Sequence, residues 1–116
     1  MKRGDVILVD FPCHDKPGSK IRPALVVQND RDNQRLANTI IAMITGNVRY
    51  AADPTNLLVD PGQADGASSG LRGPSLVKCG NLFTVTQAKV IHTIGTLSLA
   101  TMHQIDERLR VALGIP

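Results

Sequence analysis

The sequence predicts a mainly β domain, an antiparallel barrel or curled sheet of six to seven short strands with one amphipathic helix packed against it. Short runs rich in β-branched residues recur along the chain, separated by segments rich in Pro, Gly, Asn and Asp. After the last of these runs, apolar residues follow a helical spacing instead. A chain of 116 residues has room for one hydrophobic core, so we expect a single domain over residues 1–116.

The expected strands are separated by three long polar segments. Residues 12–20 contain two prolines and a glycine and are expected to form a loop. Residues 29–38 are polar and typical of turns, and residues 60–73 contain four glycines, which predicts a loop with room for one helical turn. The runs expected as strands are 4–11, 24–28, 39–45, 56–59, 74–79, 81–85 and 90–97.

One helix is expected at the C-terminal end of the chain. Ser98 is a suitable N-cap, and Gly114 stands where a helix commonly stops. Asp106 and Arg110 are four residues apart, a spacing that predicts an ion pair on the outer face. The apolar stripe predicted to face the sheet consists of Leu99, Met102, Ile105, Leu109, Ala112 and Leu113.

Composition and charge restrict the function only loosely. A net charge of +3 permits a polyanionic partner without demonstrating one, and six of the cations fall between residues 16 and 49. No apolar run approaches the roughly 18–20 residues that cross a bilayer, and no signal-like segment follows the N-terminus, so a cytoplasmic protein is expected. Cys13, Cys79 and the three histidines lack the spacing of a zinc site, so we expect two free thiols, one buried in a strand, and no metal.

Four motifs in order resemble the MazF/PemK family. They are Gly-Asp-Val-Ile-Leu-Val-Asp-Phe at 4–11, Gly-Ser-Lys-Ile-Arg-Pro-Ala-Leu-Val-Val at 18–27, Ile-Thr at 44–45 and Pro-Ser-Leu-Val-Lys-Cys at 74–79. The final strand and the helix after it fit as well. The resemblance implies an SH3-like barrel and a homodimeric toxin of a type II toxin–antitoxin system. Such toxins cut single-stranded RNA, including mRNA, at short sequences without cofactors, and their antitoxin carries a disordered acidic tail and binds DNA in the complex.

The resemblance assigns the catalytic roles to Arg22 and Thr45. RNA can be cut without a metal when its own 2′-OH attacks the adjacent phosphorus, provided that the protein stabilises the phosphate and handles two protons. The planar guanidinium of Arg22 suits the phosphate, because it can hold two oxygens at once. The Thr45 hydroxyl can bind a phosphate oxygen or orient the 2′-OH. Without the resemblance, each would be an ordinary residue at the end of a strand.

The proton carrier and the RNA contacts are less specific in the sequence. His14 lies in the loop ahead of Arg22 and has a suitable pKa for acid–base work, but it could equally be a solvent-exposed loop residue. His92 is expected to be structural and His103 exposed. Gly80 stands where some members of the family carry an acidic residue, and this departure weighs against a mechanism that relies on an Arg–Asp pair at that strand. The residues expected to contact RNA are Lys20, Arg49, Tyr50, Lys78 and Asn81.

Two other functions remain open at this point. The first is a non-catalytic toxin of the same fold that binds and poisons a protein such as gyrase, and the second is a barrel that binds RNA without cleaving it. The C-terminal residues 112–116 show no aromatic anchor, which weighs against the first. The sequence does not identify the cleavage site, the RNA target or the antitoxin.

Overall fold

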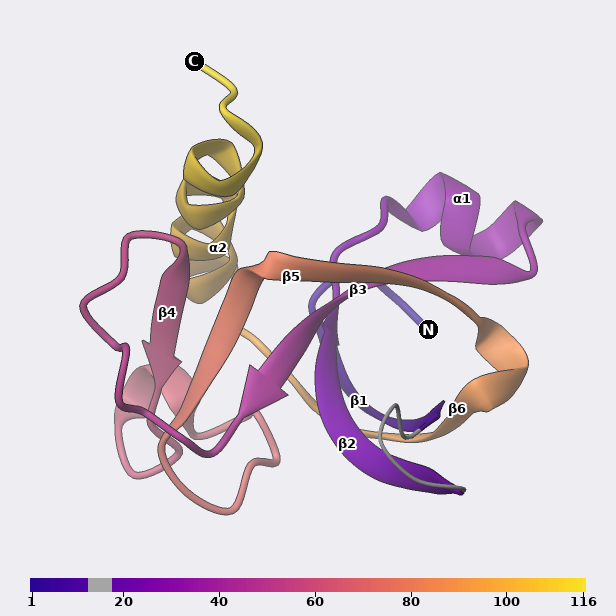
Figure 1. Ribbon diagram of the computed structural model, residues 1–116, viewed down its shortest axis with the longest axis horizontal. Coiled ribbons are helices and arrows are strands. Elements are labelled where there is room, and N and C mark those ends of the chain that lie inside the picture. The colour runs from indigo at the N-terminus through magenta and orange to yellow at the C-terminus, as the bar shows by residue number, and fades with distance from the viewer. Residues whose placement is uncertain (13–17) are drawn as a thin grey trace.

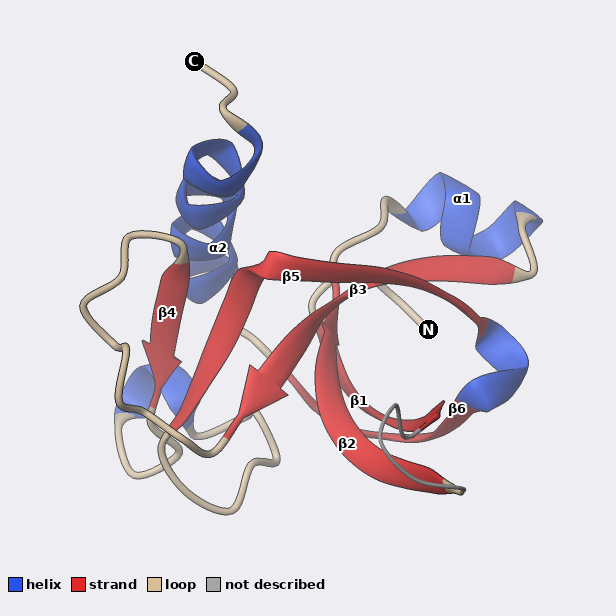
Figure 2. Ribbon diagram, viewed as in Figure 1, coloured by secondary structure: helices blue, strands red, loops and turns tan. Residues whose placement is uncertain are grey.

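The computed structural model describes residues 1–12 and 18–116, which form six strands and the helices around them. Figures 1 and 2 show a curled sheet with the long C-terminal helix at one side of it. In chain order the elements are β1 (Asp5–Pro12), β2 (Ser19–Val26), α1 (Asp30–Arg35), β3 (Asn38–Thr45), β4 (Asn56–Val59), η1 (Ala64–Gly66), β5 (Ser75–Thr86), η2 (Gln87–Lys89), β6 (Val90–Thr96) and α2 (Leu99–Leu113).

The six strands form one antiparallel sheet in the order β4-β5-β3-β2-β1-β6. The sheet curls, so that β1, β2 and β6 lie across from the second half of β5 (Figure 2). Within the described residues the first and last strands of the order, β4 and β6, do not pair with each other. The expected mainly β class with a C-terminal helix is confirmed, and the barrel is an open one.

Two hydrophobic clusters lie on opposite faces of this sheet, because successive side chains of a strand point to opposite sides. The cluster under α2, which we call the helix-side core, consists of Val6, Leu25, Ala42, Ile44, Leu57, Val59, Val77, Cys79, Leu97, Met102 and Ile105. The cluster inside the curl, which we call the inner core, consists of Ile7, Val9, Ala24, Val26 and Ile41.

The chain forms one long strand, β5, where two strands over 74–79 and 81–85 were expected. In the pairing of β3 with β5, Met43 is opposite Lys78 while the preceding Ala42 is opposite Leu82, so residues 79–81 have no partner in β3. This irregularity bends β5 without ending it, as bulges do. A glycine in the middle of an apolar run, here Gly80, indicated the bend but not that the strand continues through it.

The second strand begins at Ser19, earlier than the expected residue 24. The residues from Ser19 to Pro23 pair with β1, with Pro23 opposite Leu8. Pairing of β2 with β3 reaches only as far as Ala24, next to the proline, which has no N–H to donate. Proline therefore ends one of the two pairings and leaves the other intact, and β2 separates from β3 at this point.

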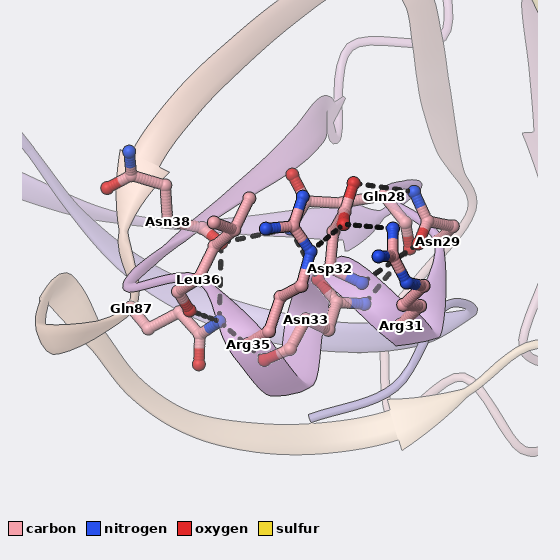
Figure 3. Close-up of polar contacts among 9 residues, drawn as sticks. All are labelled: Gln28, Asn29, Arg31, Asp32, Asn33, Arg35, Leu36, Asn38 and Gln87. Carbon is pink, nitrogen blue, oxygen red and sulfur yellow. Dashed lines mark hydrogen bonds and ion pairs between the residues drawn. The ribbon is translucent and has the colours of Figure 1, made fainter.

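The segment 29–38, expected to be turns, contains the short helix α1. Its N-cap is Asn29, whose side-chain oxygen accepts from the backbone N–H of Asp32. Figure 3 shows the polar network that holds this helix. The buried Asn33 amide donates to the Gln28 carbonyl at 2.9 Å, and the Gln87 side chain from η2 donates to the Asn33 carbonyl at 2.9 Å. Asn29 before two acidic residues was the helix signal that sequence reasoning missed.

Helix α2 begins and ends where the sequence predicts. Ser98 accepts from the N–H of Thr101, and Gly114 ends the helix in the left-handed conformation at φ 68°. The ends of the predicted apolar stripe are wrong, since Leu99 is 85% exposed and Leu113 is 57% exposed. Among the described helices, none combines the length and the apolar character that crossing a membrane requires.

Asp106 does not form the ion pair with Arg110 that the spacing predicts. Its carboxylate lies 2.6 Å from the guanidinium of Arg3, and Arg110 lies 3.7 Å from Glu107 instead. Arg3 also donates from Nε to the Val27 carbonyl at 2.9 Å. A contact between residues at opposite ends of the chain thus replaced the local pair, and it ties α2 to the start of β1.

The long loop over 60–73 lies against β6. The N–H of Thr96 donates to the Ser68 carbonyl at 2.9 Å. A Cβ added at Gly95 would lie 2.3 Å from the Ser69 carbonyl carbon, and one at Gly70 would lie 2.0 Å from a backbone oxygen of β6. Only glycine at both positions lets the two backbones approach this closely.

Candidate active site

Arg22 and Thr45 lie on neighbouring strands and belong to the same face of the sheet. The last pair between β2 and β3 joins Ala24 to Met43, and continuing that register by two residues brings Arg22 opposite Thr45. Because side chains alternate along a strand, both residues belong to the face of the inner core, as Ala24 does. The sequence predicted each of these residues at the end of a strand, and the register adds that they face each other across two neighbouring strands.

Both side chains are half-buried at the place where β2 and β3 separate. The Thr45 hydroxyl oxygen accepts from the N–H of Asn47 at 3.2 Å, and a hydroxyl that accepts one bond can still donate its own proton to an anion. Within the described residues, no carboxylate lies at ion-pair distance from Arg22. A half-buried cation and a hydroxyl donor on one face are suited to holding an anion.

A groove of about 820 Å³ lies on the other face of the sheet, the face of the helix-side core, since its lining residues Leu71 and Ile94 pack against that core. Its wall includes Ile21 and Pro23, which alternate with Arg22 along β2 and so belong to the face opposite to it, and Gly46, which follows Thr45. Arg22 and Thr45 are not themselves part of the wall. The described lining residues are Leu8, Ile21, Pro23, Gly46, Gly70, Leu71, Arg72, Gly73, Pro74, Ser75, His92 and Ile94, and the ionisable ones are the basic Arg72 and His92.

Arg49 and Tyr50 form an exposed pair in the loop over 46–55, which we call the β3–β4 loop. The guanidinium carbon of Arg49 lies 5.5 Å from the centre of the Tyr50 ring, a cation–π contact. Tyr50 is 61% exposed, whereas Phe11 and Phe83 contact each other edge to face at 5.6 Å. Tyr50 is therefore the described aromatic ring most available for stacking on a base.

Lys78 lies near the β3–β4 loop, since its charge acts on Asp53 of that loop. Lys78 pairs with Met43 on one side and Asn56 on the other, so it belongs to the face of Thr45. Lys20 is exposed on β2, two residues before Arg22 and therefore on the same face. Asn81 is exposed in the bent segment of β5, beyond the row that Lys78 occupies.

The local electrostatics agree with this arrangement. The N–H and hydroxyl of Thr55 donate to Asp53 and lower the pKa of its carboxyl group, and the positive charge of Lys78 lowers that pKa further. Cys79 follows Lys78 but points to the helix-side core, where burial raises the pKa of its thiol to about 11. An un-ionised, fully buried thiol is structural, which confirms the expected buried free cysteine.

The structure does not confirm the expectations for His14 and His92. His14 and Cys13 lie outside the described residues, so the expected proton carrier has no structural description here. His92 was expected to be structural, but it is exposed and lines the groove. It lies on the edge strand β6, where it pairs with Leu8 of β1. A histidine in an otherwise apolar strand was the only signal for it. His103 is exposed, as predicted.

The fold and the site define a small β domain that gathers cations, a hydroxyl group and an exposed ring on one face of its sheet, which is chemistry suited to nucleic acid. Residues 2–113 match the model of the PemK-like, MazF-like toxins of type II toxin–antitoxin systems. The chain belongs to this family, and the resemblance found in the sequence is confirmed.

Characterised relatives agree with this assignment over the whole length of the chain. The chain is 28% identical to endoribonuclease EndoA of Bacillus subtilis over 99% of its own length and 96% of the relative's. A mycobacterial endoribonuclease solved in complex with its cognate antitoxin matches with a TM-score of 0.78 at 25% identity, covering 100% of this chain and 97% of that chain. Mycobacterium tuberculosis toxin MazF-mt6 matches with a TM-score of 0.74 at 25% identity, covering 95% and 98%.

Proposed function

We propose that this protein is a toxin endoribonuclease that cuts single-stranded RNA, mRNA included, at short sequences in the cytoplasm. The observation that carries the proposal is the register of β2 and β3, which brings Arg22 opposite Thr45 on one face of the sheet. Membership of the toxin family and the endoribonuclease relatives support it. The functions left open by the sequence, a gyrase-directed toxin and a non-cleaving barrel, have no comparable support.

In the proposed reaction the attacking group belongs to the RNA. The 2′-oxygen forms a bond to the adjacent phosphorus, the bond from phosphorus to the 5′-oxygen breaks, and the products are a 2′,3′-cyclic phosphate and a 5′-hydroxyl. Arg22 stabilises the charge that develops on the phosphate oxygens, and Thr45 donates to one of them or orients the 2′-OH. His14 is the candidate that takes the proton from the 2′-OH and returns one to the 5′-oxygen. No step requires a metal or another cofactor.

The remaining expected residues bind the substrate in this proposal. Lys20, Lys78 and Arg49 neutralise phosphates on either side of the cut, Tyr50 stacks on a base, and Asn81 contacts a base edge. The binding partner is the cognate antitoxin, whose acidic tail competes with RNA for the same cations. The protein acts as a homodimer, for which the exposed apolar side chains of Ile91 on edge strand β6 and Ile21 on β2 provide contact surface.

The proposal predicts that Arg22→Ala reduces cleavage by about 10²–10³-fold, as removal of one charge-stabilising donor typically does. The substrate is a long single-stranded RNA in excess EDTA, and the products are mapped for cyclic phosphate ends. Because Arg22 is half-buried and lies beyond the last pair between β2 and β3, the thermal unfolding curve of the variant should match the wild type. Arg110→Ala, at an exposed position on α2, is the matched control and should cut normally.

Two results would contradict parts of this proposal. Cleavage that EDTA abolishes would exclude the metal-independent mechanism. An Arg22→Ala variant that cuts at nearly the wild-type rate would remove Arg22 from the site. The homodimer is tested separately by sedimentation, where a species with the mass of one chain at working concentration would contradict it.

A further inference from the structure

The β3–β4 loop crosses β5 on the face that carries the candidate active site. Strands β3 and β4 are both antiparallel to β5 and lie on either side of it, so they run parallel to each other and the loop must cross from one to the other (Figure 1). Asn56, the first residue of β4, pairs with Lys78 and shares its face. Because the Asn56 side chain reaches the Tyr50 carbonyl at 3.0 Å, the loop lies on that same face.

Side chains of the loop fix its backbone at short intervals. The Asn47 N–H donates to the Thr45 hydroxyl oxygen, and the Asn47 side chain in turn accepts from the N–H of Arg49 at 3.0 Å. At the other end, Asp53 accepts twice from Thr55 at 2.9 and 2.8 Å. Such local bonds give a loop the order that a strand obtains from its neighbours. The loop is therefore built as a defined structure that begins at Thr45.

Asn56 is the buried anchor of this structure. It is only 5% exposed, and a buried amide is costly unless it is hydrogen-bonded. Its Nδ2 donates to the Tyr50 carbonyl at 3.0 Å, and its own N–H donates to the Asp53 carbonyl at 3.0 Å. One side chain thus joins the first strand residue after the loop to the backbone of the exposed aromatic residue.

We propose that Asn56 is a positioning residue for the RNA substrate, which holds the Tyr50 ring as a stacking surface for a base next to the phosphate bound by Arg22 and Thr45. This inference rests on the proposed function and adds a subsite to it. Arg49 contacts the Tyr50 ring, and Lys78 on the same face binds a neighbouring phosphate. A fixed ring loses less entropy when a base stacks on it than a mobile ring does, so Asn56 strengthens binding without contacting the RNA.

The composition of the chain supplies a direct probe of this subsite. Tyr50 is the only tyrosine and the chain has no tryptophan, so intrinsic tyrosine fluorescence reports on this residue alone. A base stacked on the ring quenches that emission. A mixed-sequence pool of 2′-O-methyl ribonucleotide oligomers is a suitable titrant, because its blocked 2′-oxygen cannot attack phosphorus and the pool stays intact.

The decisive variants are Asn56→Asp and a matched control, Asn33→Asp. Aspartate keeps the size of asparagine but cannot donate to a carbonyl when ionised. Asn33 is 6% exposed and donates to the Gln28 carbonyl at 2.9 Å, so its variant loses an equivalent buried bond far from the loop. Both variants should melt at a lower temperature than the wild type. Only Asn56→Asp should weaken RNA binding.

We expect Asn56→Asp to raise the KM for RNA cleavage by about tenfold, within the range that loss of one base–aromatic stack causes, with a smaller change in kcat. Tyr50→Ala should give a similar rise, Tyr50→Phe should largely retain the wild-type KM, and the Asn56→Asp and Tyr50→Ala effects should not add in the double variant. The oligomer pool should quench the wild type and Asn33→Asp more strongly than Asn56→Asp. Cleavage maps should show weaker base preference at one common position for Asn56→Asp and Tyr50→Ala.

Three results would overturn the inference. If the wild type cuts RNA but the oligomers leave tyrosine emission unchanged, no base stacks on Tyr50 and only the subsite is wrong. If Asn56→Asp and Asn33→Asp lose stability alike and both keep the wild-type KM, Asn56 is purely structural. If the wild type cuts no RNA, the proposed function fails, and the inference fails with it.

Discussion

The two faces of the sheet differ in how they are covered. The helix-side core contains eleven buried residues under α2, from every strand of the sheet except β6 together with the helix itself. The inner core contains five buried residues from β1, β2 and β3, and the partly exposed rings and aliphatic side chains of Phe11, Val85 and Val90 complete it. Helix α2 covers the core of the first face, and the second core is open at its edge.

The difference shows where this fold can place polar chemistry. Arg22, Thr45 and Lys78 all belong to the open face, at the edge where the inner core ends. A cation there keeps contact with solvent and with a ligand, which a residue under α2 could not do without a large desolvation cost. The helix-side core therefore mainly provides stability, and the face of the inner core carries the candidate site.

Alanine substitutions in the two cores should have the largest effects on the free energy of unfolding. Ile105→Ala, in α2, removes a fully buried side chain from the helix-side core and should lower the free energy of unfolding by about 3 kcal/mol, from lost burial and the cavity left behind. Ile7→Ala removes the same groups from the inner core and should cost a similar amount. Urea denaturation measures both.

Activity should then distinguish the two alanine variants. At a temperature where both remain folded, Ile7→Ala should also slow RNA cleavage, because the inner core supports the strands that carry Arg22 and Thr45. Ile105→Ala should cleave at nearly the wild-type rate. Equal losses of activity in the two variants would show that the faces do not divide stability and function in this way.

The buried Cys79 thiol makes the stability of the helix-side core depend on pH. Burial raises its pKa to about 11 from an ordinary value of 9.0, so the unfolded chain ionises first as the pH rises. The stabilising effect is complete below pH 9.0 and is lost between pH 9.0 and about 11, which should lower the free energy of unfolding by about 2 kcal/mol. Chemical denaturation at both ends of that range measures the loss.

A cysteine-free comparison isolates the contribution of this thiol. Cys79→Ala is less stable at neutral pH, but it should lose less stability than the wild type over the same alkaline range. A background of Cys13→Ser in both proteins removes the second thiol. Parallel curves for the two proteins would mean that Cys79 ionises as easily in the folded state as in the unfolded one.

The smallest predicted effect concerns the N-caps of the two helices. Ser98→Ala removes the acceptor for the N–H of Thr101 at the start of α2 and should cost about 1 kcal/mol. Asn29→Ala removes the equivalent acceptor of α1 and should cost a similar amount or less, because the network around Asn33 also holds that helix. Thermal unfolding measures both, and a clearly larger loss for Asn29→Ala would contradict the ranking.

Local signals predicted the elements whose boundaries depend on local chemistry. Helix α2 lies between Ser98 and Gly114 as expected, because a cap and a left-handed glycine act within one turn. Non-local contacts decided the rest. The continuation of β5 through residues 79–81, the pairing of Arg3 with Asp106 and the exposure of His92 all depend on neighbours distant in sequence.

The candidate site was predictable in its residues but not in its arrangement. Resemblance identified Arg22 and Thr45, yet only the register of β2 and β3 relates them to each other. Asn56 gave no functional signal in the sequence, because an asparagine before a short apolar run is typical of any turn. Its role follows from a bond to the Tyr50 carbonyl that spans a folded loop.

The glycine contact between the 60–73 loop and β6 has a consequence for how this protein can diversify. Gly70 and Gly95 admit no side chain without displacing backbone, and residues 70 and 94 both line the groove. A single methyl group at either glycine would force the backbones of the 60–73 loop and β6 apart at this contact and would alter the wall of the groove. These two glycines therefore limit which substitutions the groove can accept.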